Sequence, residues 1–233
     1  MMAVRSTLFR RLRRLLLGVI LALVLLPTLL IVVYKFVDPP ITPLMVIRLF
    51  EGESLDKTWV PLDRISSHLV KSVISAEDNL FCEHHGFDGD ALWQQIQTWL
   101  AGDRPRGAST ITMQTAKNIA LWPGRDVPRK LIEAWMTPQI ELLWSKQRIL
   151  EVYLNVAEMG PGIYGAEAAA QAYFGKTARQ LSPLEGSLIA ATLPNPRELF
   201  AARPSSYVTS RARKIRRRTD QLGPLLDCAI PEP

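Results

Sequence analysis

The sequence has few of the side chains that bind metals through sulfur or imidazole nitrogen. Its 233 residues include only two cysteines and three histidines. Cys82 and Cys228 form no Cys-x-x-Cys or Cys/His ligand pattern, and the adjacent His84 and His85 would point to different faces of a helix. We therefore expect no metal site. The two cysteines permit at most one disulfide, and we interpret both as incidental because sequence separation says nothing about proximity.

The sequence also lacks internal repeats, low-complexity tracts and convincing runs of alternating apolar and polar residues. Helical spacing of apolar residues recurs instead, in segments 65–74, 92–100, 128–158 and 166–173. Ser66 or Ser67 is expected to cap the first of these, and Pro138 is expected to kink or break the third. Ser182-Pro183-Leu184-Glu185 resembles a capping box that opens a further helix. The prediction is a mainly α-helical single domain.

Acidic residues are absent before Asp38, whereas five arginines precede a long apolar run. As a helix, the twenty residues from Leu15 to Tyr34 would be about 30 Å long, enough to cross the hydrocarbon core of a bilayer. A basic flank stays on the cytoplasmic side of a membrane. We therefore predict four parts: a cytoplasmic basic tail at 1–14, a transmembrane helix at 15–37, a juxtamembrane linker at 38–58 and an extracytoplasmic domain at 59–233.

A cleaved signal peptide is the main alternative to a retained anchor. Its apolar region usually has only about 7–15 residues and ends at small residues. The run seen here is longer and ends in Tyr34-Lys35-Phe36-Val37. A retained anchor, kinked at Pro27, is therefore favoured, and a buried helix of a soluble core is the weaker alternative.

The net charge of +6 comes from two clusters. The N-terminal arginines and a C-terminal group together carry more positive charge than the whole chain, so the rest of the chain has a net negative charge. The C-terminal group consists of Arg211, Arg213, Lys214, Arg216, Arg217 and Arg218. A nucleic-acid-binding domain would carry basic residues over its folded face, so no nucleic acid is expected as a partner. We interpret the C-terminal group as the solvated face of a closing helix, with contact to anionic lipid headgroups as the alternative.

Glu77 is the first candidate for chemistry. It lies three and four residues after Ile74 and Val73, so it extends an apolar helical stripe. Partial desolvation raises the pKa of a carboxyl group, which suits it to proton transfer. The plainer alternative is that Glu77 and Asp78 lie at a solvated helix end.

Two further groups of polar residues follow at helical spacing. Segment 107–118 holds hydroxyls and then the donors Gln114, Lys117 and Asn118, a set that can bind phosphate but lacks the Gly-Lys-Ser/Thr ending of a Walker A loop. Arg129, Lys130 and Glu133 share one helix face. Read plainly, the first is a capped amphipathic helix and the second a surface salt bridge. Asn155, in a fourth segment, is expected to be a buried hydrogen-bonding residue.

The order and spacing of these groups resemble the peptidoglycan glycosyltransferase family, which also supplies the N-terminal domain of bifunctional penicillin-binding proteins. The matching stretches are Glu77-Asp78-x-x-Phe81-x-x-His84-x-Gly86-Phe87-Asp88, Gly107-x-Ser109-Thr110-Ile111-Thr112-x-Gln114-x-x-Lys117-Asn118, Arg129-Lys130-x-x-Glu133, Lys146-x-x-Ile149-Leu150-Glu151-x-Tyr153-Leu154-Asn155 and Leu193-Pro194-Asn195-Pro196. Ala108 replaces a glycine found in many members and makes the stretch similar to the monofunctional biosynthetic transglycosylases. Met113 replaces a common glutamine.

The resemblance implies a lysozyme-like helical domain that transfers the growing polyprenyl-pyrophosphate-linked glycan onto the 4-hydroxyl of lipid II, with inversion, at the bacterial inner membrane. Glu77 would be the catalytic base, and Glu133, the second catalytic residue, would support the donor side or a divalent cation. Lys117, Arg125, Arg129 and Lys130 would neutralise the pyrophosphate. Substrate would also contact Asp78, Phe81, His84, Ser109, Thr110, Gln114 and Asn118, with Phe81 and His84 lining the cleft.

No cofactor is expected to be required, and a divalent cation, Mg²⁺ or Mn²⁺, is expected only with the pyrophosphate. Expected partners are lipid II, the growing strand, membrane lipid and proteins of division or wall synthesis. A glycan-cleaving glycosidase is the closest alternative, but it has little need for phosphate-binding cations. A non-catalytic membrane scaffold is a second alternative. A truncated bifunctional protein is a third, yet Ser54-Leu55-Asp56-Lys57 has no following Lys-Thr-Gly.

Overall fold

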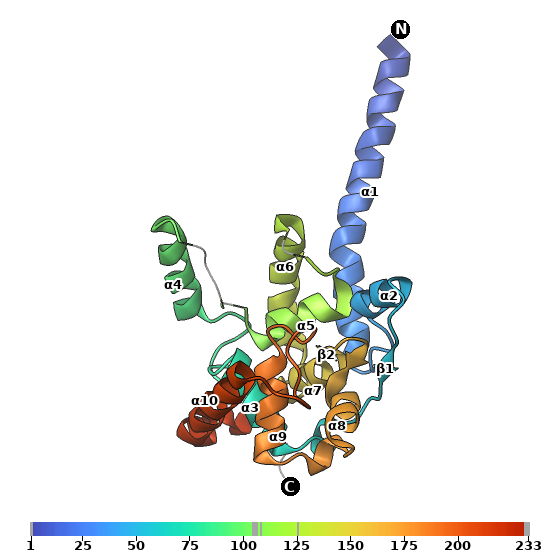
Figure 1. The fold of residues 1–233 in the computed structure, drawn as a ribbon. Coiled ribbons are helices and arrows are strands. Elements are labelled where there is room, and N and C mark those ends of the chain that lie inside the picture. The colour runs from blue at the N-terminus through green and yellow to red at the C-terminus, as the bar shows by residue number, and fades with distance from the viewer. Residues whose placement is uncertain (1, 104–106, 108, 125, 231–233) are drawn as a thin grey trace.

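Helix α1, Met2–Tyr34, extends from one side of a body of helices (Figure 1). The computed structural model describes residues 2–103, 107, 109–124 and 126–230. Helix α1 is longer than the predicted span, includes the predicted basic tail, and contains Pro27 within it. Its large apolar side chains from Leu12 to Leu29 are exposed where they are described. Within the described residues, no helix meets both the length and the hydropathy needed to cross a membrane, so the transmembrane prediction finds no support there.

The end of α1 is packed against the body. Ile31 is fully buried, and its carbonyl accepts a hydrogen bond of 2.8 Å from the Trp144 indole. The Arg148 guanidinium donates to the carbonyl of Tyr34 at 2.9 and 3.1 Å and to that of Val37 at 3.0 Å. The two bonds from Arg148 to Tyr34 satisfy a carbonyl that the end of the helix leaves open. The last turns of α1 therefore belong to the folded domain.

Residues 38–58, predicted as a linker, contain helix α2, Pro43–Phe50, and strand β1, Asp56–Lys57. Thr42 caps α2 by accepting the Met45 N–H, and Met45 is fully buried. Strand β1 pairs in parallel with β3, Ile163–Tyr164, which pairs antiparallel with β2, Glu158–Gly160. The sequence analysis missed this small sheet because two or three residues are too few to show alternation.

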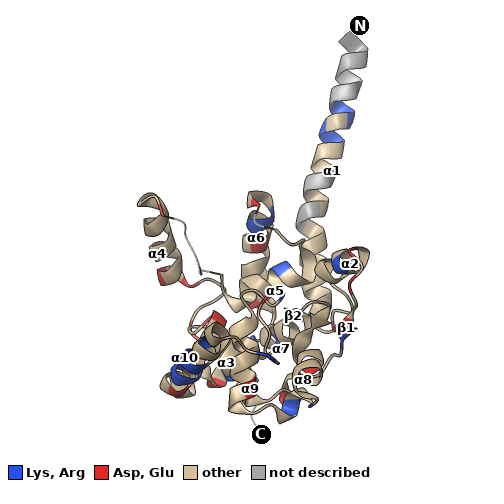
Figure 2. Cartoon of the chain, viewed as in Figure 1, with Lys and Arg blue, Asp and Glu red and all other residues tan. Residues whose placement is uncertain are grey.

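Helices α3, α9 and α10 form one packed layer of the body. Helix α3, Ser67–Glu77, begins at the Ser66 cap, and α9, Pro183–Thr192, begins at the Ser182–Glu185 capping box, as predicted. Helix α10, Ser206–Leu222, carries an outer row of basic residues (Figure 2). Gly186 of α9 is required by this packing, because a Cβ there would lie 2.9 Å from the backbone nitrogen of Leu69.

Helices α5, α6 and α7 form a second group that packs together. They span Ile111–Ala120, Val127–Leu143 and Lys146–Val156. Pro138 lies inside α6, and the break between helices falls at Trp144 and Ser145 instead. Asn155 is fully buried and bonds both the N–H and the carbonyl of Val60, which confirms the predicted buried hydrogen-bonding role.

Helix α4, Gly89–Leu100, projects from the body on the side from which α1 rises (Figure 1). It has no buried residue, and Trp93 and Trp99 are 59% and 65% exposed. The remaining elements are α8, Gly165–Phe174, and three short 3₁₀ helices, η1 at Leu62–Arg64, η2 at Ala178–Gln180 and η3 at Gly223–Ala229.

A disulfide joins Cys82, which follows α3, to Cys228 in η3, with a Cα–Cα distance of 5.8 Å. The prediction that both cysteines are incidental was therefore wrong. The fold brings together residues that are 146 positions apart, which sequence spacing could not indicate.

Candidate active site

Glu77 is the last residue of α3, and its side chain is only 15% exposed. Its Oε2 accepts a 3.1 Å hydrogen bond from Gln114 Nε2 on α5, and Oε1 lies 3.7 Å from the Arg211 guanidinium on α10. Burial raises the pKa of Glu77, while the Gln114 hydrogen bond, Arg211 and Lys117 partly oppose that shift. The predicted environment of this carboxyl group, partly desolvated at the end of an apolar stripe, is confirmed.

Gln114, which bonds Glu77 directly, is itself held in place by Tyr153. Its Oε1 accepts a 3.1 Å hydrogen bond from the hydroxyl of Tyr153 on α7, which leaves the amide Nε2 to point at Glu77. Tyr153 is buried, and burial raises the pKa of its phenol well above the usual value, so it remains a donor. The chain from Tyr153 through Gln114 therefore fixes one oxygen of the carboxylate.

Asp78 and His84 lie in the core and make structural contacts. Asp78 is the C-cap residue after α3, and its Oδ2 accepts the Ile111 N–H at the start of α5 at 2.8 Å. Its Oδ1 lies 2.8 Å from His84 Nε2. The side chains of Asp78 and His84 are 3% and 8% exposed, which leaves little surface for a substrate. These two residues fix the segment after Glu77 onto α5.

Phe81 does not line a cleft, contrary to prediction. It is fully buried, and the Lys146 ammonium lies 4.5 Å from the centre of its ring. Lys146 also donates to the His84 carbonyl at 2.7 Å. Gly86 completes this packing with φ +94°, because a Cβ there would lie 2.8 Å from Thr137 Cγ2. Asp78, Phe81, His84 and Gly86 therefore support the site through packing and hydrogen bonds instead of lining it.

Glu133 forms the second carboxylate centre, on α6. The Arg129 guanidinium bonds its Oε2 at 2.5 Å, and the Lys130 ammonium bonds its Oε1. Lys130 also donates to Ser109 Oγ at 3.0 Å, which brings the segment before α5 to this cluster. The predicted shared face is confirmed. Arg129 and Glu133 are buried, so their pairing is more than a solvated surface bridge.

Lys117, on α5, lies within the electrostatic range of both carboxylates. Burial lowers the pKa of its ammonium, Glu133 raises it, and the nearby cations Arg129 and Lys130 lower it further. Glu77 also acts on it, by raising the pKa. Helix α5 therefore carries Gln114, which bonds Glu77, and Lys117, which is subject to the charge of both carboxylates.

A small cleft of about 180 Å³ opens beside Lys117 and Asn118. Arg48, from α2, and Glu158, from β2, also line it, together with Trp122.

Thr110 is buried away from this cleft, because its hydroxyl caps α5 and donates to the Gly86 carbonyl at 2.7 Å. Arg125, predicted to bind phosphate, lies outside the described residues. In the described part of the chain, no group of three or more His, Cys, Asp or Glu side chains could hold a metal ion.

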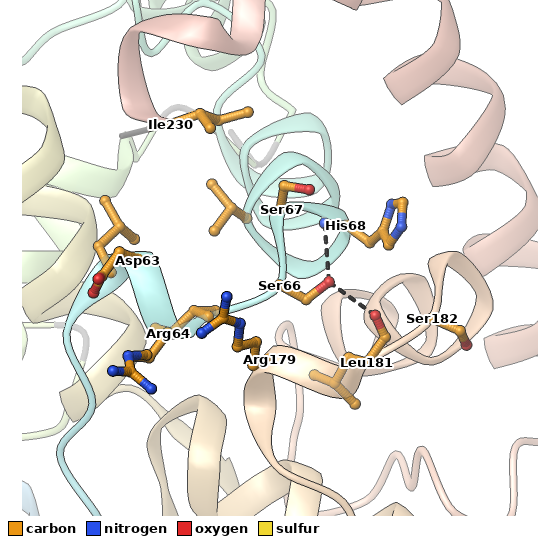
Figure 3. A pocket seen from close by; sticks show the side chains of 12 residues that line it. Asp63, Arg64, Ser66, Ser67, His68, Arg179, Leu181, Ser182 and Ile230 are labelled. Carbon is orange, nitrogen blue, oxygen red and sulfur yellow. Dashed lines mark hydrogen bonds between the residues drawn. The ribbon is translucent and has the colours of Figure 1, made fainter. Parts of the chain in front are cut away.

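A larger cavity of about 710 Å³ lies at the other end of α3 (Figure 3). Arg64 and Arg179 line it, and the Ser66 hydroxyl donates a hydrogen bond to the Leu181 carbonyl at its wall (Figure 3). Neither Glu77 nor Glu133 lines it. It is therefore separate from the candidate active site.

Arg211 was not predicted as a site residue, because it lies in sequence among the solvated basic residues of α10. A signal was present, because Arg211 lies three residues after Val208 and four before Ile215, both of which are buried. That spacing places Arg211 on the inner face of the helix. The rest of the group, Arg213, Lys214, Arg216, Arg217 and Arg218, is exposed, which confirms the interpretation of a solvated face for those residues.

The arrangement combines a desolvated carboxylate with a separate cationic cluster. The carboxylate can accept a proton, and the cluster can stabilise an anionic leaving group. A site of this kind suits the transfer of a group from a phosphate-linked donor to a hydroxyl.

Comparison with known proteins agrees with this chemistry. A family model described as Transglycosylase matches residues 45–220. A biosynthetic peptidoglycan transglycosylase of Caulobacter vibrioides is 50% identical over 210 residues, which cover 90% of this chain and 92% of that protein. Proteins with the same name in Rhodospirillum centenum and Bdellovibrio bacteriovorus are each 52% identical, over 209 residues (89% of this chain, 90% of that protein) and 191 residues (79% and 76%), respectively.

Proposed function

The chain belongs to the transglycosylase family, and from that premise we propose which of its residues carry out the transfer. The protein is a peptidoglycan glycosyltransferase that polymerises glycan strands in cell wall synthesis. The donor is the growing strand, linked through pyrophosphate to a polyprenyl carrier, and the acceptor is lipid II. The roles of individual side chains follow from the geometry of the two carboxylate centres.

Glu77 is the base of the reaction. Its ionised carboxylate takes the proton of the acceptor 4-hydroxyl as that oxygen attacks the anomeric carbon of the donor. The bond between that carbon and the pyrophosphate oxygen breaks, the configuration inverts, and polyprenyl diphosphate leaves with the electron pair. The hydrogen bond from Gln114 to Glu77 Oε2 supports this role, since it orients the carboxylate without protonating it.

The cationic cluster acts on the leaving group. Lys117, Arg129 and Lys130 supply positive charge for the pyrophosphate, and Arg125 is assigned to the same role. Glu133 holds Arg129 and Lys130 in place through its two oxygens. Ser109, Gln114 and Asn118 orient sugar and phosphate oxygens, Ser109 being tied to this cluster through Lys130.

The observation that carries the proposal is the cationic cluster at Glu133, where Arg129 and Lys130 bind the two oxygens of that carboxylate. A glycan hydrolase needs two carboxylates about the scissile bond but no cations for a phosphate. Here the second carboxylate is already bound by two cations, so it is not free to act as an acid. This arrangement favours synthesis over cleavage.

Helix α1 attaches the enzyme to the inner membrane, with its basic N-terminal end in the cytoplasm and the body outside. The exposed leucines of α1 and the apolar side chains of α4 support this placement, because both elements extend from the same side of the body (Figure 1). The disulfide supports an extracytoplasmic body, since disulfides persist in oxidising compartments. A polyprenyl tail stays in the bilayer, so an enzyme that acts on it must work at the membrane surface.

No bound cofactor is required under this proposal, because protein cations neutralise the pyrophosphate. Mg²⁺ or Mn²⁺ acts only as a counter-ion that arrives with the substrate. Treatment with EDTA is then expected to slow polymerisation without abolishing it. Proteins of division and wall synthesis are proposed as partners, and nucleic acid is not.

The test is incubation of the detergent-solubilised protein with labelled lipid II and, separately, with finished glycan. The expected result is polymer from lipid II and no shortening of the finished glycan. Release of short fragments from finished glycan, with lipid II left intact, would identify a hydrolase instead.

A further inference from the structure

Arg211 faces Glu77 from α10, outside every sequence motif of the site. Its Nη2 lies 3.7 Å from Glu77 Oε1, and its side chain is 29% exposed. Its Nε is enclosed and has no hydrogen-bond partner within the described residues. Among those residues, Glu77 is the carboxylate within ion-pair range of Arg211. No other ion pair in the described structure therefore accounts for the position of this guanidinium.

The position of α10 does not depend on Arg211 itself. Arg218 donates to the Ser75 carbonyl at 3.1 Å, and the Thr219 hydroxyl donates to Ser75 Oγ at 2.9 Å. Ser75 lies two residues before Glu77 on α3. The disulfide Cys82–Cys228 joins the segments that follow α3 and α10. On the α3 side these attachments lie before and after Glu77, and on the α10 side both follow Arg211.

The two oxygens of Glu77 have different surroundings. Oε2 accepts the Gln114 hydrogen bond, whereas Oε1 faces Arg211 at a distance longer than a normal hydrogen bond. Oε1 therefore keeps a lone pair available to an incoming hydroxyl while it remains in the field of a cation. We propose that Arg211 is a positioning residue for the transfer, which holds Glu77 as an oriented carboxylate with Oε1 open to the acceptor. This inference rests on the proposed role of Glu77 as the base.

The consequence is a specific pH dependence. The groups that act on Glu77 are Lys117 and Gln114 from α5, Arg211 from α10, and the adjacent Asp78. Tyr153 from α7 also faces it through Gln114. Loss of the Arg211 charge leaves burial and Asp78 to raise the pKa of Glu77, opposed only by the α5 groups. Because the base acts only when ionised, the acidic limb of the rate profile moves to higher pH.

The experiment measures kcat/KM against pH for the full chain in detergent with labelled lipid II. In Arg211→Gln, the acidic limb is expected to move up by about one pH unit, since an opposite charge within about 4–6 Å typically lowers a carboxyl pKa by 1–3 units. Arg211→Lys keeps the charge and is expected to restore most of the wild-type limb. Arg217→Gln is the matched control, because it removes the same charge from the exposed face of α10.

A uniform loss of rate in Arg211→Gln, with the limb unmoved, would overturn the inference. If Arg211→Gln does not fold, the pH profile of Arg211→Lys alone is the test. An acidic limb that moves to higher pH in Arg211→Lys, although the charge is retained, would contradict the positioning role of Arg211. Failure of the proposed function has a different signature: Glu77→Gln would remain active, whatever Arg211 does.

Discussion

Glu77, the proposed base, is a carboxylate that the fold places in an unfavourable environment. Burial raises the pKa of Glu77, so at neutral pH the folded state holds a charge that would be better solvated in the unfolded chain. Stability linked to Glu77 is therefore greatest below the usual glutamate pKa and falls as pH rises through the raised value. Burial of the Glu77 carboxylate thus reduces the stability of the folded state at neutral pH.

Glu77→Gln should accordingly raise the melting temperature near neutral pH, because the neutral amide removes the cost of burying the charge. The gain should vanish under acidic conditions, where the wild-type carboxyl group is already protonated in both states. Thermal unfolding monitored by circular dichroism at the two pH values checks this. A lower melting temperature of the variant at neutral pH would contradict the sign of the shift.

Lys117→Ala should weaken use of the donor. A hydrogen bond to a charged group contributes about 1.5–3 kcal/mol, so KM for the donor strand should rise by about tenfold to a hundredfold. Initial rates measured against donor concentration test this, with Lys214→Ala on the exposed face of α10 as the control. An unchanged dependence on donor concentration would exclude the assigned role.

At the scale of single residues, more of the site's composition than of its geometry could be predicted from the sequence. The apolar stripe before Glu77 and the spacing of Arg129 and Glu133 follow from helical periodicity, and the structure confirms both. Periodicity cannot show which motif residues face inward, so Phe81 was wrongly placed in the cleft. It also could not bring Arg211 to Glu77, since that contact depends on how α10 packs on α3.

At the scale of elements, the segment after α3 determines where α5 begins. The Asp78 carboxylate accepts the Ile111 N–H in the first turn of α5, at a place with no access for water to replace it. Asp78→Ala would leave that donor buried and unpaired, which costs about 1–3 kcal/mol. We expect a lower denaturation midpoint together with lower activity.

Ser109→Ala provides the contrast, because Ser109 is exposed and bonds Lys130 at the cationic cluster. It should raise KM without a change in the denaturation midpoint. Equal midpoints for wild type and Asp78→Ala would show that Asp78 acts on substrate rather than on the fold.

Helix α1 allows a separate prediction about attachment. Leu21 and Leu25 are 58% and 52% exposed on α1. In a bilayer, lysine at the centre of an apolar helix costs about 2.5–3.5 kcal/mol, so Leu21→Lys with Leu25→Lys should move protein from the membrane fraction to the supernatant. Leu184→Lys, at an exposed position of α9, is the control. Equal sedimentation of all three proteins would contradict attachment through α1.

Helix starts were the most predictable elements of the fold. Ser66 and the Ser182–Glu185 capping box mark them locally, because the cap satisfies N–H groups of the first turn. The extent of α1 was less predictable. Its last turns look like membrane helix in sequence, but they bond Trp144 and Arg148, and only tertiary packing reveals that.

At the scale of the whole molecule, the disulfide connects the segment after the proposed base to the end of the chain. It closes a loop with a sequence separation of 146, and disulfides closing long loops typically stabilise by about 2–5 kcal/mol. The double variant Cys82→Ser, Cys228→Ser should lose stability in that range, measured by urea denaturation. Reduction of the wild type should produce the same loss, and a midpoint unaffected by either change would contradict the predicted contribution.

The central claim is that Glu77 is the base of a glycan polymerase. The most direct measurement is the initial rate of strand formation from labelled lipid II by full-length wild type, Glu77→Gln and the exposed control Glu83→Gln. We predict that Glu77→Gln loses about 10²–10⁴-fold in rate while it still binds lipid II, and that Glu83→Gln keeps the wild-type rate. Polymerisation by Glu77→Gln at near the wild-type rate would contradict it.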